Sequence, residues 1–231
     1  ILRKMNLIET LRIWDTNLFL ALNGIHSPFF DGFMMAFSNK LVWIPFYISV
    51  LYVMIKQWKS EAFWIVLSFA ICILLADQIS SGIIKNAVQR LRPSREETIS
   101  GLVHLVDGYR GGKYGFVSSH AANSLGFAVL SAYFFRKRSY TLIILLWSLI
   151  TGYSRIYLGV HYPLDVMGGY LVGFFVAIFC YWLLKKLKPN IFYVSSRFRS
   201  KRFADSTLPL LVLTFTVVGI FGWSLIRILA F

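Results

Sequence analysis

The stretch at residues 163–184, PLDVMGGYLVGFFVAIFCYWLL, decides the fold that this chain can adopt. Beyond Asp165 it carries no charged residue, and at about twenty residues it has the length that an α-helix needs to cross a bilayer. Comparable apolar runs occur at residues 41–55, 62–85, 119–135, 142–157 and 208–229. We therefore predict an all-α integral membrane protein, a helical bundle with six spans.

Composition supports a membrane protein and excludes a nucleic-acid partner. The chain is 57% hydrophobic and only 15% charged, with a mean hydropathy of +0.64. Its net charge of +14 would suggest nucleic-acid binding in a soluble protein. Here the basic residues cluster in short loops beside the apolar runs, where the positive-inside rule and anionic headgroups favour them. Since no aromatic and basic RNA-binding pattern is present, we expect membrane lipids as partners.

The apolar runs divide the chain into three segments. Residues 1–40 are amphipathic, and we predict two interfacial helices at the membrane surface, broken near residues 24–28. A short, tilted extra span is the alternative there. Residues 41–187 form the predicted membrane core, in which the polar loop at residues 94–117 is long enough to cover a site. Residues 188–231 hold a basic loop and an additional C-terminal membrane helix.

Small residues inside the apolar runs are predicted to serve helix packing. Gly169 and Gly173 lie about one helical turn apart and offer a face for close contact with another helix. Cys72 and Cys180 both lie in apolar runs, so we expect buried thiols that behave as small hydrophobic groups. The sequence has no cysteine, histidine or acidic spacing typical of a metal site, and we expect neither a metal nor a cofactor.

Three polar clusters interrupt the apolar pattern where runs meet loops: Lys85-x6-Arg92-Pro93, Ser118-Ser119-His120, and Ser154-Arg155-x5-His161-x3-Asp165. Their cations, imidazoles, hydroxyls and carboxylate suit the binding of a phosphate and attack on its phosphorus. The alternation of spans places all three clusters on one side of the membrane. Once the motif cations are set aside, that side carries fewer basic residues, which favours the periplasm or cell exterior.

The first two clusters offer groups that bind anions. Lys85 and Arg92 would share one face of a continuous helix, although both could instead snorkel to lipid headgroups. Ser118 precedes a predicted helix, whose free N–H groups favour an anion, although Ser118 would also serve as an ordinary N-cap. His120 has no capping role at this boundary, and its imidazole can hold or release a proton near neutral pH.

The third cluster joins two spans. Arg155 closes one helix, His161 begins the turn, and Asp165 follows about one helical turn later. A carboxylate at that spacing can bind one ring nitrogen of His161 and leave the other as a nucleophile. Asp165 alone could be a first-turn acid favoured by the helix dipole, but that alternative does not account for Arg155 and His161.

In this order, the clusters resemble the motifs of the type-2 phosphatidic acid phosphatase superfamily, in its bacterial membrane lipid phosphatase branch. The family motifs are K-x6-R-P, P-S-G-H and S-R-x5-H-x3-D, and the resemblance extends over residues 41–184. The first and third motifs match completely, and the second matches at Ser118 and His120. Val117 replaces the usual proline and Ser119 the usual glycine; Ser119 keeps its backbone N–H, so we expect activity to survive.

The resemblance implies a role for each residue. His161 would attack phosphorus to form a phosphohistidine, Asp165 would orient its ring, and His120 would protonate the leaving oxygen. The phosphate oxygens would be held by a set of cations, hydroxyls and backbone N–H groups: Lys85, Arg92, Ser118, Ser119 and Arg155. Because three fixed cations supply the charge, no metal would be required.

Charges outside the motifs are candidates for supporting roles. Asp77 lies inside the second predicted span, where a carboxylate is a functional candidate by default, and we expect it in a polar network beside Lys85. Arg95, Arg110 and Lys113 in the loop at residues 94–117 either meet a second phosphate or are simply solvated.

The predicted function is that of a metal-independent membrane lipid phosphatase. The resemblance implies undecaprenyl diphosphate, phosphatidylglycerophosphate, phosphatidic acid or lipid A as the substrate, and we favour the first. A lipid-to-lipid phosphotransferase is the alternative on the same scaffold, and a lipid transporter or binding scaffold is the non-enzymatic alternative. Haloperoxidases share these motifs, with vanadate in place of phosphate, but six spans argue against that class.

Overall fold

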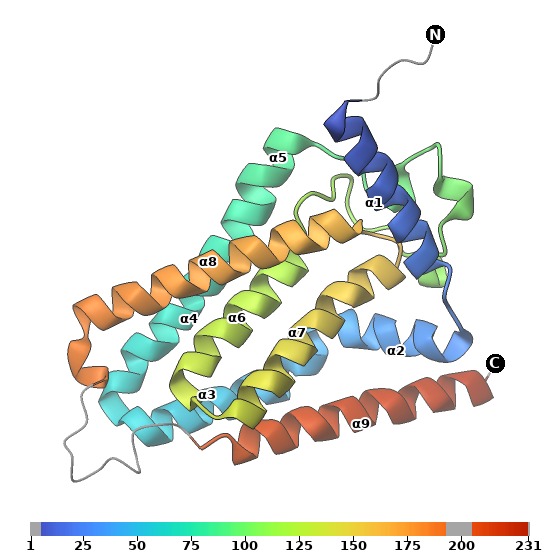
Figure 1. Ribbon diagram of the computed structural model, residues 1–231. Helices are drawn as coiled ribbons and strands as arrows, with labels where there is room; N and C mark the ends of the chain where they lie inside the picture. Colours follow the sequence, from blue (N-terminus) through green and yellow to red (C-terminus); the bar gives the residue numbers. More distant parts are fainter. Residues whose placement is uncertain (1–5, 193–204, 231) are drawn as a thin grey trace.

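The computed structural model describes residues 6–192 and 205–230, and these residues are mostly helical (Figure 1). The α-helices are α1 (Leu7–Asn23), α2 (Pro28–Ser38), α3 (Ile44–Trp58), α4 (Ala62–Asp77), α5 (Lys85–Val88), α6 (Ser119–Phe135), α7 (Arg138–Tyr157), α8 (Pro163–Leu187) and α9 (Thr207–Leu229). The all-α prediction is confirmed for this part of the chain. Most of the predicted basic loop after residue 188 lies outside the described residues.

Three helical stretches are long and apolar enough to cross a membrane: Lys40–Val88, Pro163–Leu187 and Thr207–Leu229. The first contains two predicted spans, because Lys59, with a φ of 50°, ends α3 and α4 continues in a new direction (Figure 1). The count of six spans is not confirmed, since α6 and α7 are not among these stretches.

The central position of α6 explains why it lacks the features of a lipid-facing span. It has 17 residues, or about 26 Å, against a hydrocarbon core of about 30 Å. It packs between α4, α7 and α8, and most of its side chains are buried against them. A helix surrounded by other helices can carry serine and glycine, because it does not need apolar side chains on every face.

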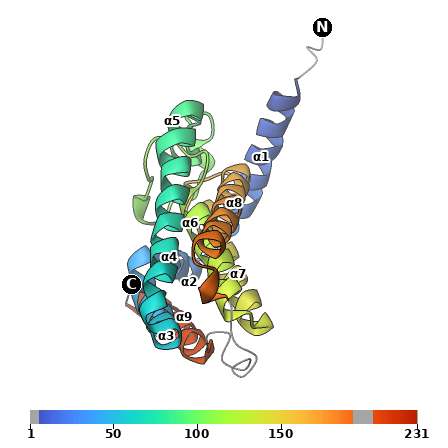
Figure 2. The ribbon, with the colours of Figure 1, turned by 90° about the vertical axis from the view of Figure 1, so that its left-hand side faces the viewer.

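The N-terminal segment forms two helices, as predicted. Asn6 and Glu9 make a reciprocal capping box at the start of α1, while Ser27 caps α2 and Pro28 occupies its first position. Figures 1 and 2 show α1 at the end of the bundle where α5 ends, while α2 lies along α9 and also contacts α7. The position of these helices at the membrane surface stays a prediction.

Glycines bring α6 and α8 into close contact, as the spacing of Gly169 and Gly173 predicts. A Cβ on Gly173 would stand 2.1 Å from the carbonyl oxygen of Ala122. A Cβ on Gly169 would stand 2.3 Å from the carbonyl oxygen of Ser118, at the start of α6. The same packing buries Cys72 and Cys180 as free thiols, as expected.

The helix that carries Lys85 ends earlier than predicted. Gln78–Ile84 forms a π-helical stretch, and α5 ends at Val88, because Gln89 adopts a left-handed conformation with a φ of 51°. Arg92 is extended, as a residue before proline prefers to be. The prediction that Lys85 and Arg92 share one face of a continuous helix is therefore wrong, and a turn in the chain separates them.

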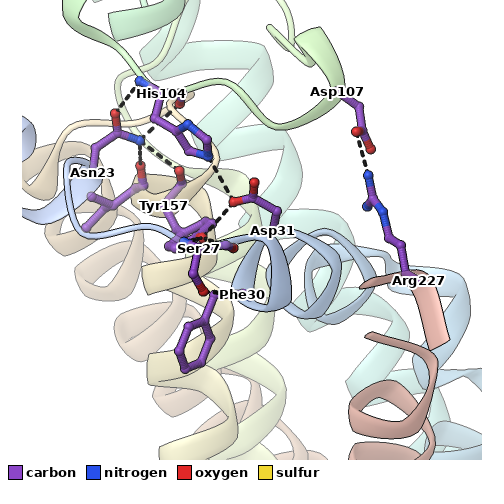
Figure 3. A network of polar contacts seen from close by, with 9 residues as sticks. Asn23, Ser27, Phe30, Asp31, His104, Asp107, Tyr157 and Arg227 are labelled. Carbon is purple, nitrogen blue, oxygen red and sulfur yellow. Dashed lines mark hydrogen bonds and ion pairs between the residues drawn. The ribbon is translucent and has the colours of Figure 1, made fainter. Parts of the chain in front are cut away.

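The loop at residues 94–117 is attached to three helices by a polar network (Figure 3). The side-chain amide of Asn23, the last residue of α1, donates to the Tyr157 carbonyl at 2.7 Å and accepts the His104 N–H at 2.8 Å. The His104 ring lies 2.9 Å from the Asp31 carboxylate of α2, which also accepts the Tyr157 hydroxyl at 2.7 Å. These contacts fix the loop against α1, α2 and the end of α7.

The loop has further anchors on either side of this network. The Ser94 N–H donates to the Gly159 carbonyl at 3.1 Å, in the turn between α7 and α8. The Asp107 carboxylate lies 2.6 Å from the Arg227 guanidinium near the end of α9 (Figure 3). The loop therefore folds against the end of the bundle where the three polar clusters lie.

Candidate active site

His161 lies in the turn between α7 and α8, and its two ring nitrogens face different charged groups. Its Nε2 is 3.0 Å from Arg92 Nη1, and its Nδ1 is 3.4 Å from Asp165 Oδ2. An arginine N–H can only donate, so Nε2 is the acceptor and the proton of the neutral ring resides on Nδ1. The Nδ1 and Oδ2 atoms are close enough for an ion pair, but their geometry does not meet that of a hydrogen bond.

Backbone hydrogen bonds bring the members of the third cluster together. The carbonyl of Arg155 accepts the N–H of His161 at 3.2 Å and so folds the turn back onto the end of α7. Gly159 makes this turn with a φ of 72°. At the start of α8, the Tyr162 N–H donates to Asp165 Oδ2 at 3.0 Å, which fixes the carboxylate beside the imidazole.

Arg92 is buried, and backbone carbonyls hold its side chain. Its Nε donates to the Tyr114 carbonyl and its Nη1 to the Val160 carbonyl, both at 3.0 Å. Gly111 leaves room for the guanidinium, since a Cβ there would stand 3.1 Å from Nη1. Arg92 is thus fixed in place with Nη1 against His161 before any ligand arrives.

Arg155 is a second buried cation, and helix α2 contributes to holding it. Its Nη1 donates to Ser38 Oγ at the end of α2, and its Nη2 donates to the Tyr109 hydroxyl of the covering loop at 3.0 Å. Its Nε is buried and has no hydrogen-bond partner in the described part of the chain. A buried cationic donor without a partner is available to a ligand.

The second cluster forms the first turn of α6. The Ser118 side chain caps this turn, and the Ser118 N–H donates to the Asp165 carbonyl at 2.8 Å, which ties the starts of α6 and α8 together. The N–H groups of Ser119 and His120 point out of the helix start, where no intrahelical acceptor exists. Lys85 Nζ lies 3.4 Å from Ser119 Oγ.

The cations converge on the two imidazoles. Lys85, Arg92 and Arg155 all act electrostatically on both His120 and His161. Burial, and then the charge of Arg92, lower the pKa of His161 well below its ordinary value, so its ring is neutral at pH 7. Burial and the nearby Arg155 lower the pKa of Arg92 to about 10, which leaves Arg92 charged. Such a concentration of positive charge attracts an anion.

The charged residues outside the motifs differ in burial and in their distance from the site along the chain. Asp77 is half-buried at the end of α4 and acts electrostatically on Lys85, as the expected polar network requires. Arg95, Arg110 and Lys113 are exposed on the loop, and Arg95 donates to a loop carbonyl, that of Gly111, at 3.2 Å. A second-phosphate role for these three residues stays a prediction.

Several residues around the site were not predicted from the sequence. Arg90 lies inside the first motif and contacts both Asp165 and Asp15 of α1, while Ser38 and Tyr109 contact Arg155. The one available signal was Asp15, a carboxylate in an amphipathic helix that turns out to be completely buried. The other contacts join segments far apart in the chain, which residue spacing does not report.

Comparison with known proteins agrees with this geometry. The PAP2 superfamily matches residues 61–189, a range that includes all three clusters. A lipid A 4'-phosphatase of Bacteroides thetaiotaomicron is 45% identical over 188 residues, which cover 80% of this chain and 83% of that protein. An undecaprenyl-diphosphatase of Sulfolobus acidocaldarius is 27% identical over 170 residues, which cover 74% of each chain.

The fold is also shared with a solved structure. A transmembrane PAP2-type phosphatidylglycerolphosphate phosphatase from Bacillus subtilis matches with a TM-score of 0.60 and 22% identity, covering 78% of this chain and 88% of its own. The helical bundle therefore has the same fold as that solved structure. With the superfamily match over more than half of the chain and a relative at 45% identity, this protein belongs to the PAP2 superfamily and is a membrane lipid phosphatase.

Proposed function

We propose that this protein hydrolyses a phosphomonoester on the sugar headgroup of lipid A, through a phosphohistidine on His161. The similarity to a lipid A 4'-phosphatase supports the substrate, and the relative named for undecaprenyl diphosphate is the more distant of the two. Undecaprenyl diphosphate, which the sequence led us to favour, is not confirmed. The observation that carries the mechanism is the line of contacts from Arg92 through His161 to Asp165.

In the first step, Nε2 of His161 attacks phosphorus. The N–P bond forms as the P–O bond to the lipid sugar breaks, and the sugar oxygen takes a proton from His120. The negative charge of the bound phosphate would keep His120 protonated for this step by offsetting the cations around it. The substrate phosphate replaces Nε2 as the acceptor of the Arg92 N–H, which frees the nucleophile. Asp165 accepts the Nδ1–H and stabilises the positive charge that grows on the ring.

In the second step, water hydrolyses the phosphohistidine. His120 takes a proton from the water as the oxygen attacks phosphorus, and the N–P bond breaks to restore neutral His161 and release inorganic phosphate. Lys85, Arg92 and Arg155 would neutralise the charge on the non-bridging oxygens in both steps. Ser118, through its cap, and Ser119 would present the helix N–H groups. With this charge in place, the reaction is proposed to need no metal.

The proposed membrane arrangement keeps six spans, with the site facing the periplasm or cell exterior. The short helix α6 and the more polar α7 would cross as interior helices, surrounded by the more apolar stretches. The polar clusters lie at helix ends, where a lipid headgroup meets water. Acyl chains could therefore remain in the bilayer while the phosphate reaches His161.

Two other functions are compatible with parts of the site. A lipid-to-lipid phosphotransferase would form the same phosphohistidine but pass the phosphoryl group to a second lipid instead of water. A transporter or binding scaffold would use the cations without turnover. Phosphate release without an added lipid acceptor argues against both.

The test uses purified protein in detergent with a chelator and a panel of lipid A, undecaprenyl diphosphate, phosphatidylglycerophosphate and phosphatidic acid. We expect the highest kcat/KM with lipid A, and a loss of about a thousandfold or more in His161→Ala. Arg138→Ala, which replaces an exposed residue at the start of α7, is the control and should match the wild type. A higher kcat/KM with another lipid overturns the substrate; release that needs a metal, or survives His161→Ala, overturns the mechanism.

A further inference from the structure

Arg90 lies between two buried carboxylates from distant parts of the chain. Its Nη1 is 2.7 Å from Asp15 Oδ2 and 3.1 Å from Asp165 Oδ1, and both carboxylate side chains are 0% exposed. Its guanidinium carbon lies 3.8 Å from the centre of the Tyr162 ring. Two ion pairs and a cation–π contact therefore fix one arginine beside the residue that faces His161.

Asp15 joins the N-terminal helix to the start of α8. It belongs to α1, outside residues 61–189 that match the family. Besides its contact with Arg90, its Oδ1 accepts the Leu164 N–H at 2.9 Å, one residue before Asp165. A carboxylate at this position also interacts favourably with the positive end of the helix dipole. Phe19 adds an edge-to-face contact from α1 to Tyr162, with ring centres 5.4 Å apart.

We propose that Arg90 and Asp15 are positioning residues of the phosphatase reaction. Asp15 holds Arg90, and Arg90 keeps Asp165 ionised and oriented so that it holds the Nδ1–H of His161. Helix α1 is thus part of the machinery, although it lies outside the family match. This inference rests on the function proposed above.

The charges around Asp165 explain why Arg90 is needed. The groups that face this carboxylate are Asp15 on α1, Arg90 and Arg92 after α5, and His161 and Tyr162 before α8. Lys85 of α5 also interacts with it electrostatically. Without Arg90, two buried carboxylates would face each other, and like charges at short range do not both stay ionised. Arg92 does not replace it, because its Nε and Nη1 donate to backbone carbonyls and to Nε2 of His161, whereas Asp165 faces Nδ1 of that ring.

Replacement of Arg90 tests the first contact. In Arg90→Met, we expect kcat to fall by about tenfold to a hundredfold, as for other groups that orient a reactive histidine. KM should change little, because Arg90 is not among the groups proposed to bind phosphate. The acid limb of the kcat profile should move to higher pH, since Asp165 would take up a proton more readily. Arg90→Lys should recover part of the activity.

A double substitution separates positioning from a purely structural role. Asp15→Asn alone should lower kcat about threefold, because it removes the charge that fixes Arg90 but keeps an oxygen for Leu164. In the Arg90→Met background, the same change should raise kcat about threefold, because it removes the carboxylate that faces Asp165. If Arg90 and Asp15 had a purely structural role, the losses of kcat caused by the two substitutions would add in the double variant.

The controls are matched charge losses at the opposite end of the bundle. Arg138→Met and Asp205→Asn replace exposed residues there and should keep the wild-type kcat and pH profile. If Arg90→Met does not fold, the test uses Arg90→Lys and Asp15→Asn instead, and measures the same two quantities, kcat and its pH profile.

The outcomes distinguish this inference from the function on which it rests. If the wild type releases no phosphate from any lipid, both are overturned. If the wild type is active but Arg90→Met keeps its kcat and pH profile, the inference alone is overturned. The same holds if Asp15→Asn lowers kcat further in the Arg90→Met background.

Discussion

Ser119 stands where the family motif has glycine, and its place in the structure supports the expectation that activity survives the change. The contribution expected from this position is a backbone N–H at the helix start, which any residue except proline supplies. Its hydroxyl contacts Lys85 Nζ at 3.4 Å, a long and therefore weak hydrogen bond.

We expect Ser119→Gly and Ser119→Ala to keep phosphate release within about fivefold of the wild type, since a long hydrogen bond contributes about 1 kcal/mol at most. The comparison of the two variants separates loss of the hydroxyl from loss of Cβ. A drop of a hundredfold in both would show instead that the hydroxyl itself takes part in the reaction.

The protonation of His161 provides a second test at the residue scale. Burial and the neighbouring cations lower the pKa of His161 well below 6.5, so its ring should stay neutral as the pH falls through 6.5. NMR of ring-labelled histidines in detergent, with His161→Ala for assignment, measures this directly. Because the unfolded residue titrates near pH 6.5, its contribution to stability is complete above that pH and declines below it. A ring that titrates near 6.5 in the free protein would contradict the geometry.

Some contacts of the site could be predicted from the sequence and others could not. The spacing of His161 and Asp165 predicted that they would meet, because four residues make one helical turn from the start of α8. The partnership of Arg90 with Asp15 could not be predicted, because it depends on how α1 docks against α8. For the same reason, the contacts of Arg155 with Ser38 and Tyr109 emerged only from the structure.

At the scale of elements, the contact between α6 and α8 positions two of the three clusters. Helix starts were predictable where a residue has one clear local role, as Ser118 does for α6 and Pro163 for α8. The end of α5 was not, because a π-helical stretch and a left-handed Gln89 carry no clear sequence signal.

Gly173→Ala tests that contact. The added methyl would meet the Ala122 carbonyl at 2.1 Å, so the helices must separate, at a cost of about 1–3 kcal/mol in unfolding free energy. Thermal unfolding in detergent should show a lower midpoint together with reduced activity. Gly219→Ala in α9 is the matched control. Apart from the backbone of α9 itself and the adjacent residues, no described atom lies within 4 Å of the point where its Cβ would stand, so the added methyl should slightly stabilise the helix. Equal midpoints for the two variants would contradict the close approach.

At the scale of the whole molecule, the polar network of Figure 3 joins segments of the chain that the hydropathy pattern assigns to different parts of the protein. The loop at residues 94–117 binds α1, α2, α7 and α9, while the clusters it covers come from α5 to α8. Hydropathy predicted six spans, and that number is not confirmed, because an interior helix such as α6 does not need to be apolar on every face. The N-terminal helices and α9 thus contact the loop that covers the site from outside residues 61–189, which match the family.

The most direct test of the account is to isolate the phosphorylated enzyme. Protein mixed with lipid A carrying labelled phosphate, quenched in alkali within one turnover and digested, should yield one labelled peptide. Mass spectrometry should place the phosphate on the imidazole of His161, with the acid lability and alkali stability of a phosphohistidine. The same experiment with His161→Ala should give no label. Label on another residue, or full turnover without any labelled peptide under single-turnover conditions, would contradict a reaction through His161.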